Sequence, residues 1–552
     1  MRTTVELIAD GRRIPAMKGT TVAAALLDAG VRGFRRSIGG EPRGPLCGMG
    51  ICFECRVTID DVPHRRACLV PVADGMRVST GEDEGTARRP VARMTNGATW
   101  PATRPAQALT ADIVVVGAGP AGIAAAVAAE RGGRRVVLLD AGLTPGGQIW
   151  RHAPGSAPPR EARELIGRLT ASSVTMLLGT SVVEVRCADP GGGGGGAFVV
   201  LGEGAGRPCR VEARAVVLAT GARELFLPFP GWTLPGVVGV GGAQALLKMG
   251  SSVAGRRVVV AGTGPLLLPV AASLARAGAR LTLVAEQANR RAVVRFGASL
   301  WRRPGLVLRA TRYRAAFART RYVTGRWVVA AEGDGRIQRV TVTDGRNAGG
   351  HTLDCDLLCV AYGLVPNTEL ARLVGCTMVR GTVVVDERQQ TSITGVYCAG
   401  EPTGVGGADL ALVEGEIAGF AAAGETVIPA RLFATRERLR TAAAAMERAF
   451  SPRVELRRAC TEDTIVCRCE DVPRRALEPQ GSSRQAKLYT RAGMGACQGR
   501  ICGSALEFLS GWTPDSVRAP IEPTLLSTFL TDDASPSPTT HCDVPTLQQG
   551  AI

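Results

Sequence analysis

Two groups of four cysteines stand near opposite ends of the 552-residue chain. The first is spaced C-x4-C-x2-C-x12-C and the second C-x-C-x27-C-x4-C; in order they are Cys47, Cys52, Cys55 and Cys68, then Cys467, Cys469, Cys497 and Cys502. Thiolates from one tight loop and one more distant strand can surround a two-iron, two-sulfide cluster. The spacing C-x4-C-x2-C at the start of the first group is typical of such sites. Each group is therefore predicted to be a set of metal ligands. Two such groups in one polypeptide favour a role in electron transfer.

Zinc and disulfide bonds are the alternative uses of clustered cysteines. Four thiolates satisfy zinc as well as iron, so zinc stays open for the second group. The first ten residues include Arg2, Glu6 and Asp10 and lack the apolar core of a secretion signal. We therefore expect a reducing cytoplasmic setting, which favours metal ligation over disulfides. The eight remaining cysteines, such as Cys355 and Cys359, are scattered and are expected to pack as small apolar side chains.

The net charge of +17 is compatible with several kinds of partner. Aromatic residues make up only 4% of the chain, and the arginines are spread along its whole length. A nucleic-acid-binding surface would concentrate basic residues in one stripe, so no nucleic-acid partner is expected. No apolar run reaches the roughly 18 residues that a membrane-spanning helix needs. Any association with the inner membrane would therefore be peripheral.

The first cysteine group lies in a region, residues 1–79, whose pattern predicts a small mixed fold. Alternating segments around Asp10-Gly11 predict a β-hairpin. Thr20 or Thr21 can cap an apolar helix that stops at Gly30, and a glycine-rich loop with Gly48 and Gly50 then carries the cysteines. Hairpin, helix and cysteine loop in this order resemble the β-grasp ferredoxin domain. Residues 80–110 lack periodicity and are expected to form a linker.

The central region begins with the pattern of a dinucleotide-binding unit. An apolar strand, Asp112 to Val116, is followed by a G-x-G-x-x-G motif, an alanine-rich helix and a second strand that ends at Asp140. The first glycine permits the turn, the second admits a pyrophosphate to the helix N-terminus, and the third allows close packing. The terminal acid can hold ribose hydroxyls. The predicted cofactor contacts here are Gly117, Gly119, Pro120, Ala121, Gly122 and Asp140.

A second unit of the same kind begins at Arg257 and carries a departure from the motif. After Gly262 and Gly264 the third glycine position is Leu267, and Glu286 ends the second strand. A leucine at that position keeps the helix from approaching the strand as closely as the motif requires. We therefore favour a domain that is kept for packing over one that exchanges a nicotinamide.

Four further segments resemble the two-dinucleotide-domain flavoproteins. Residues 145–148 match the loop that faces the flavin ring, 219–223 and 361–367 match two strand-end motifs, and 395–401 match the late FAD segment, whose usual aspartate is Glu401 here. The resemblance implies FAD, or another adenine nucleotide, with added contacts at Gly147, Gln148, Thr220, Gly221, Gly400 and Glu401. We expect the FAD domain at 111–244 and 376–427, with a second Rossmann-like domain inserted at 245–375.

The C-terminal region is expected to contain a connecting helix at 428–455, a small domain at 456–525 and a tail at 526–552. Val466 to Glu470 and Gly493 to Gly503 resemble the [2Fe-2S] domain of bacterioferritin-associated ferredoxin. The x4 spacing of the last cysteine pair is similar to the version fused to amine-oxidising flavoprotein subunits. This resemblance favours a second [2Fe-2S] cluster over zinc.

Taken whole, the chain resembles the α subunit of the hydrogen cyanide synthase, opine dehydrogenase and hydroxyproline dehydrogenase group, related to the heterotetrameric sarcosine oxidases. Residues 228–237 and 493–502 carry most of this match, and a ferredoxin domain is fused at the N-terminus. The resemblance implies an α/β and α+β multidomain protein that relays electrons from an FAD-containing β subunit, which oxidises an amino acid, imino acid or opine. It also implies an FMN at the subunit boundary and a downstream electron acceptor.

Three other functions compete with this relay. A self-contained NAD(P)H-dependent reductase needs a working second dinucleotide site, against which Leu267 argues. A disulfide reductase needs a cysteine pair near the flavin, and the stretch from Asp140 to Leu178 has none. A scaffold protein would not need eight thiolates at cluster spacing. None of the four histidines sits in a recognisable constellation, so we assign no catalytic residue.

Overall fold

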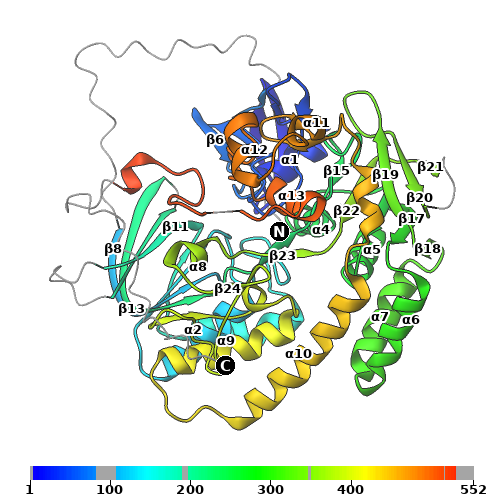
Figure 1. The fold of residues 1–552 in the computed structure, drawn as a ribbon. Helices are drawn as coiled ribbons and strands as arrows, with labels where there is room; N and C mark the ends of the chain where they lie inside the picture. Colours follow the sequence, from blue (N-terminus) through cyan, green and yellow to red (C-terminus); the bar gives the residue numbers. More distant parts are fainter. Residues whose placement is uncertain are drawn as a thin grey trace, which may run out of the picture.

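The computed structural model describes residues 4–81, 107–188, 197–204, 206–345, 350–514 and 516–529. An N-terminal unit and a small C-terminal unit lie side by side over a core of two dinucleotide-binding domains (Figure 1). Most of the predicted linker and nearly all of the predicted tail lie outside the described residues. Among the described residues, no helix is both long and apolar enough to cross a membrane.

The N-terminal unit is the predicted β-grasp domain. Its sheet has the order β2-β1-β7-β5-β6, in which β1 pairs antiparallel with β2 and parallel with β7. Thr21 caps the helix by accepting from the amide of Ala24, and Asp10 and Gly11 turn the first hairpin with positive φ. The elements are β1 Thr4–Ala9, β2 Arg12–Met17, α1 Val22–Asp28, β3 Arg35–Arg36, β4 Pro42–Arg43, β5 Arg56–Ile59, β6 Val62–Arg66 and β7 Arg77–Ser79.

The first dinucleotide-binding domain is built on a seven-stranded sheet in the order β10-β9-β8-β13-β12-β11, with β26 also paired to β13. Helix α9 packs against α2 through glycines, because a Cβ on Gly415 would lie 2.1 Å from the Ala121 oxygen. The elements are β8 Gln107–Val116, α2 Pro120–Arg131, β9 Val136–Asp140, α3 Arg163–Ala171, β10 Thr175–Leu178, β11 Thr180–Cys187, β12 Phe198–Gly204, β13 Arg207–Leu218, α8 Glu369–Val374, β24 Met378–Val379, β25 Thr382–Val383, β26 Val396–Cys398 and α9 Ala408–Ala422.

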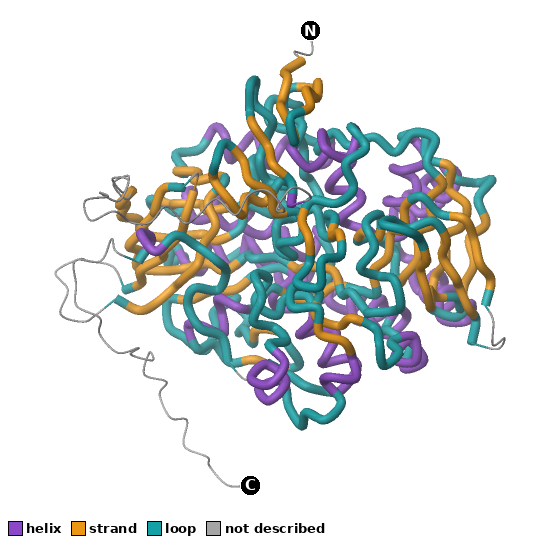
Figure 2. The backbone as a smooth tube through the Cα atoms, turned by 90° about the horizontal axis from the view of Figure 1, so that it is seen from above, coloured by secondary structure: helices purple, strands orange, loops and turns teal. Residues whose placement is uncertain are grey.

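The second domain has a parallel sheet in the order β15-β22-β16-β17-β18 and an antiparallel sheet, β19-β20-β21. Figure 2 shows its strands at the opposite side of the molecule from the first domain's sheet. The elements are β15 Val237–Val238, α4 Val240–Lys248, β16 Arg257–Gly262, α5 Leu267–Arg276, β17 Arg280–Glu286, α6 Arg290–Ser299, α7 Pro304–Ala316, β18 Arg321–Thr324, β19 Trp327–Glu332, β20 Arg339–Thr343, β21 His351–Asp354 and β22 Leu357–Ala361.

The two domains join at a short antiparallel pair, β14 Ala222–Glu224 with β23 Leu364–Pro366. Strand β15 pairs with β22 of the second sheet. Strand pairing therefore assigns residues from about 237 onward to the second domain, whereas the sequence pattern places that boundary at residue 245.

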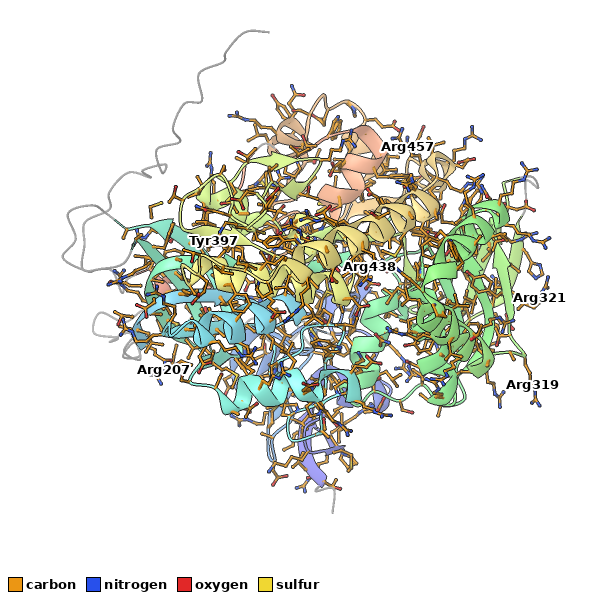
Figure 3. The ribbon with its side chains drawn as sticks, turned by 90° about the horizontal axis from the view of Figure 1, so that it is seen from below. Arg207, Arg319, Arg321, Tyr397, Arg438 and Arg457 are labelled. Atoms are coloured by element: carbon orange, nitrogen blue, oxygen red, sulfur yellow. The ribbon has the colours of Figure 1, made fainter. Side chains whose placement is uncertain are left out.

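A long helix, α10 Ala430–Phe450, leads from the first domain past the second (Figure 3). In the same view Arg438, on this helix, lies between Arg207 of the first domain and Arg319 and Arg321 at the outer edge of the second. The C-terminal unit follows, with η5 Val454–Ala459, β27 Ile465–Cys467, β28 Val472–Pro473, α11 Arg474–Leu477, α12 Ser483–Thr490 and α13 Cys502–Ser510. Residues up to η6 Leu526–Thr528 then return to the first sheet, where the Ile521 amide donates to the Val183 oxygen.

Candidate functional site

Three members of the first cysteine group, Cys47, Cys52 and Cys55, lie in the loop between β4 and β5, and Cys68 follows β6. All four side chains are at most 2% exposed, and the Cys47 and Cys52 sulfurs are 3.2 Å apart. Cys55 and Cys68 form a second contacting pair. Backbone amides point at the sulfurs, since Met49 and Cys52 both donate to the Cys47 sulfur at 3.4 Å. Gly48 and Gly50 have positive φ, which lets the loop curl around the sulfurs.

The second cysteine group has the same arrangement of two pairs. Cys467 contacts Cys502, and Cys469 contacts Cys497. Gly495 must lack a side chain here, because a Cβ at this position would lie 2.2 Å from the Cβ of Cys469. Cys469 is partly exposed, whereas the other three cysteines are at most 2% exposed.

The arrangement of the sulfurs in two pairs can be compared with the ligand sets of a single metal ion and of a two-iron cluster. A structural zinc site places four ligands tetrahedrally around one ion, whereas in a [2Fe-2S] cluster the four thiolates are shared between two irons. Sulfurs in two pairs, with backbone amides directed at them, fit the ligand set of a two-iron cluster in both groups.

The first dinucleotide site has the geometry that its glycines predict. A Cβ on Gly117 would lie 2.2 Å from the Ala219 oxygen, and one on Gly122 would lie 1.7 Å from the Gly117 oxygen. A Cβ on Gly119 would meet no protein atom within 4 Å. The space beside Gly119, at the N-terminus of α2, is therefore open to a pyrophosphate, as the motif requires. Pro120 and Ala121 form the first turn of this helix, and no side chain caps it.

Asp140 ends β9 beside this turn. Its carboxylate accepts from the amides of Ala118 and Gly142, both at 2.5 Å, and the side chain is partly exposed. Burial raises its pKa, and the two amides oppose that effect. A partly exposed carboxylate at this strand end is in a suitable place to accept hydrogen bonds from ribose hydroxyls.

The predicted flavin-facing segments gather around the same helix end. A Cβ on Gly147 would lie 2.9 Å from the Cα of Gly119, and one on Gly400 would lie 2.9 Å from the Cβ of Ala121. Gln148 is exposed at the rim, where its carbonyl oxygen accepts from Lys248 Nζ at 3.4 Å. The structure thus brings residues from separate segments to one site.

Thr220 and Gly221 lie where the two domains interlock. The Thr220 hydroxyl donates to the Asn367 oxygen at 2.5 Å, the Asn367 side-chain amide donates back to the Thr220 oxygen at 2.9 Å, and the Asn367 backbone amide donates to the Gly221 oxygen. Arg223 continues this contact to the second cysteine group, donating to the Arg500 oxygen at 3.0 Å. The strand-end motif at residues 219–223 and the second cysteine loop are therefore in direct contact.

Glu401, the predicted late FAD contact, is hydrogen-bonded to the loop that precedes α9. Its carboxylate accepts from the amides of Gly406 at 3.1 Å and Gly407 at 2.9 Å, just before α9. Burial raises its pKa to about 7, against the effect of these hydrogen bonds. The carboxylate therefore holds the loop before α9, and any cofactor contact would be additional to this.

The second dinucleotide site is covered by the end of α10. The Thr263 hydroxyl donates to the Phe450 oxygen at 3.0 Å, and the Gln287 side chain donates to the Ser451 oxygen at 3.1 Å. Glu286, the counterpart of Asp140, is 0% exposed, and burial raises its pKa to about 7. It accepts from the Gly264 amide at 2.7 Å. The Glu286 carboxylate is therefore held by groups of the chain itself, namely the Thr263 hydroxyl and the amides of Gly264 and Ala288.

Several residues that connect the sites carry no motif of their own in the sequence. Arg151, 9% exposed and three residues beyond the predicted flavin-facing loop, donates to the Gly48 oxygen of the first cysteine loop at 2.8 Å. Glu54, between Cys52 and Cys55, forms an ion pair at 3.4 Å with Arg468, between Cys467 and Cys469. The sequence shows that Glu54 and Arg468 lie inside the two cysteine motifs, but it does not show that they pair. His152, to which the sequence assigns no role, contacts the Trp150 oxygen at 3.0 Å.

Comparisons with known proteins agree with this architecture. A family model for pyridine nucleotide-disulphide oxidoreductases matches residues 111–448, and one for 2Fe-2S iron-sulfur cluster binding domains matches residues 2–83. An opine oxidase subunit of Agrobacterium tumefaciens is 33% identical over 435 residues, which are 72% of this chain and 84% of that protein. Hydrogen cyanide synthase subunit HcnB of Pseudomonas aeruginosa is 34% identical over 436 residues, 70% of this chain and 90% of that protein.

A solved structure shows the same fold over nearly the whole chain. L-proline dehydrogenase from P. horikoshii superposes with a TM-score of 0.68 and 21% identity, covering 96% of this chain and 97% of that one. The predicted flavoprotein core and N-terminal ferredoxin-like domain are thereby confirmed. The chain belongs to the pyridine nucleotide-disulphide oxidoreductase family, in the group that contains the Agrobacterium opine oxidase subunit and hydrogen cyanide synthase subunit HcnB, and it carries an N-terminal 2Fe-2S domain.

Proposed function

We propose that this chain is the electron-transfer subunit of a heteromeric flavin-dependent dehydrogenase that acts on an amino acid, imino acid or opine. The observation that carries the proposal is the contact of both cysteine groups with the first dinucleotide domain. Arg151, just after the flavin-facing loop, hydrogen-bonds to the first cysteine loop, and Arg223, in the motif that contains Thr220, hydrogen-bonds to the second. The relatives named as an opine oxidase subunit and a hydrogen cyanide synthase subunit support the substrate class and the subunit role.

The proposed cofactors are FAD, or another adenine nucleotide, in the first domain and a [2Fe-2S] cluster at each cysteine group. Bound there, they would supply one- and two-electron redox chemistry. The protein's own part is to hold them: the α2 N-terminus and Asp140 bind the nucleotide, and the buried cysteine loops exclude water from the sulfurs. The proposal also includes an FMN at the boundary with the partner subunit. The ligands proposed for the second cluster are Cys467, Cys469, Cys497 and Cys502.

Substrate oxidation is placed in a separate FAD-containing β subunit. Three of the four histidines lie in the described part of the chain: His64 and His351 are exposed, and His152 contacts a backbone oxygen. None of these three is arranged with an acid or base at the first dinucleotide site. The proposal therefore assigns this chain to the relay of electrons to a downstream acceptor in the cytoplasm.

Anaerobic addition of NADH tests the relay against the self-contained reductase. In the purified chain, NADH is expected to leave the flavin absorbance unchanged over a period in which dithionite bleaches it completely. The physical reason is that Phe450 contacts Thr263 of the second glycine motif, Ser451 contacts Gln287, and Glu286 is buried. The measurement is the visible spectrum recorded against time.

The control is the complex purified from its host with the partner subunit. In that complex an oxidisable amino acid or opine, screened across the class, is expected to bleach the same absorbance. Rapid bleaching of the isolated chain by NADH would favour the reductase, and substrate turnover by the isolated chain would contradict the division of labour.

A further inference from the structure

Four arginines form a buried cluster between the two cysteine groups, and we refer to them as the arginine cluster. Arg35 is 8% exposed, and Arg43 and Arg468 are each 3% exposed. Arg56, the fourth member, is partly buried and lies near both Cys55 and Cys469. Arginine is rarely buried without a partner because removing its charge from water is costly. A cluster of this kind therefore needs compensating negative charge nearby.

The acids in contact with the arginine cluster do not balance it. Glu54, 1% exposed, pairs with Arg35 at 2.9 Å and with Arg468 at 3.4 Å, and Asp471 pairs with Arg43 at 2.8 Å. Two carboxylates thus face four guanidinium groups. The remaining negative charge must come from another source.

Unpaired donors show where a partner of the arginine cluster is missing. Among the described residues, every buried side-chain nitrogen or oxygen that lacks a hydrogen-bond partner is the Nε atom of one of these arginines, namely Arg35, Arg43, Arg56 and Arg468. Buried polar groups in proteins are normally hydrogen-bonded, so orphan donors point to an anionic partner. The thiolates of a cysteine-bound iron–sulfur cluster carry negative charge, and a cysteine group lies on each side of the arginines.

Arg468 has the most constrained position in the cluster. It lies between Cys467 and Cys469, donates to the Trp232 oxygen at 2.6 Å, and has its guanidinium 4.9 Å from the centre of the Trp232 ring. Its partner Glu54 lies between Cys52 and Cys55. The Glu54–Arg468 ion pair therefore has one residue inside each cysteine motif. Because both side chains are buried, solvent screens their charges only weakly.

We infer that Arg468, held in place by Glu54, is a positioning residue that sets the reduction potentials of both cysteine-bound clusters together. Its positive charge stabilises the more negative, reduced form at each site, and the charge of Glu54 opposes this effect. No bond forms or breaks and no proton moves, because the guanidinium stays charged throughout. This inference rests on the proposed function, since it requires a cluster at the second cysteine group.

The test is a redox titration of the whole protein followed by electron paramagnetic resonance, which reports each cluster's reduced fraction separately from turnover. In Arg468→Gln, the reduced-to-oxidised ratio at a fixed ambient potential is expected to fall about tenfold at both sites, equal to about 59 mV for a one-electron couple. In Glu54→Gln it is expected to rise at both sites. In Arg468→Lys, which keeps the charge, a smaller shift is expected.

Arg491→Gln is the matched control. Arg491 also pairs with an acid beside a cysteine, Glu470, at 2.7 Å, but its side chain is 64% exposed. Solvent screens exposed charges, so less than about a twofold change in the reduced-to-oxidised ratio is expected. Structural damage would not produce shifts of opposite sign in the two glutamine variants, so opposite signs support the electrostatic role.

Two different failures can be told apart. If wild-type protein shows both cluster signals but the potentials do not move in Arg468→Gln and Glu54→Gln, the inference is overturned and the proposed function stands. If wild-type protein shows no signal from the second cysteine group, the second cluster of the proposed function fails and the inference fails with it. If Arg468→Gln does not fold, Glu54→Gln and Arg468→Lys are compared instead, and unchanged potentials at both clusters in Glu54→Gln overturn the inference.

Discussion

Replacement of Cys497 by serine is expected to remove about half of the iron and to leave the N-terminal cluster intact. The sulfurs of the second group form two contacting pairs, so losing Cys497 leaves Cys469 without its partner. One iron then lacks a thiolate, and the cluster is expected not to assemble. The measurement is iron and acid-labile sulfide per chain, together with the visible spectrum. Cys52→Ser is expected to give the reciprocal result at the first group.

Cys460→Ser provides the matched control for this experiment. Cys460 is 2% exposed and belongs to the same C-terminal apolar cluster as Cys467, but its thiol forms hydrogen bonds with Arg474 and Thr464. It should retain the full complement of iron. Full iron in Cys497→Ser, or equal losses in Cys497→Ser and Cys460→Ser, would refute the assignment of ligands.

Gly119→Ala is expected to lower the affinity for the flavin nucleotide at least about tenfold while the protein stays folded. Gly119 has a φ of −77°, which any residue can adopt, and an added Cβ would meet no protein atom within 4 Å. The methyl group would instead occupy the space through which a pyrophosphate approaches the α2 N-terminus. Flavin released on denaturation, measured per chain by absorbance, reports the loss, and circular dichroism reports the fold.

The control for Gly119→Ala is Gly167→Ala on α3 of the same domain. A Cβ on Gly167 also meets no protein atom within 4 Å. The residue is exposed, and it is distant in sequence from the glycine motif at 117–122. This variant should keep its flavin. Full flavin content in Gly119→Ala would place the nucleotide elsewhere in the protein.

The sequence was most informative where the chemistry is local. The cysteine spacings predicted two compact ligand groups, and the structure brings each group together because its members lie on short loops and adjoining elements. The strand, glycine, helix and acid pattern at residues 112–140 likewise predicted the first dinucleotide unit, since its steric demands involve neighbouring turns. The domain boundary near residue 237 had no such signal, because β15 is two residues long and has no periodicity.

Contacts between distant segments could not be predicted in this way. The Glu54–Arg468 pair joins positions 414 apart in sequence, and the Thr263–Phe450 hydrogen bond joins positions 187 apart. Leu267 indicated that the second dinucleotide site is altered, but not that the chain itself covers it. The burial of the arginine cluster could not be predicted from residue type either, because arginine is expected at the surface unless a partner compensates its charge.

The electron-transfer role is tested by the metal and sulfide content of the wild-type protein, combined with Mössbauer spectroscopy. Two iron–sulfur sites flanking a nucleotide domain predict about four iron atoms and about four acid-labile sulfides per chain, all in two-iron clusters. Zinc in place of iron, or iron without sulfide, at the second cysteine group would contradict the electron-transfer role proposed for this chain.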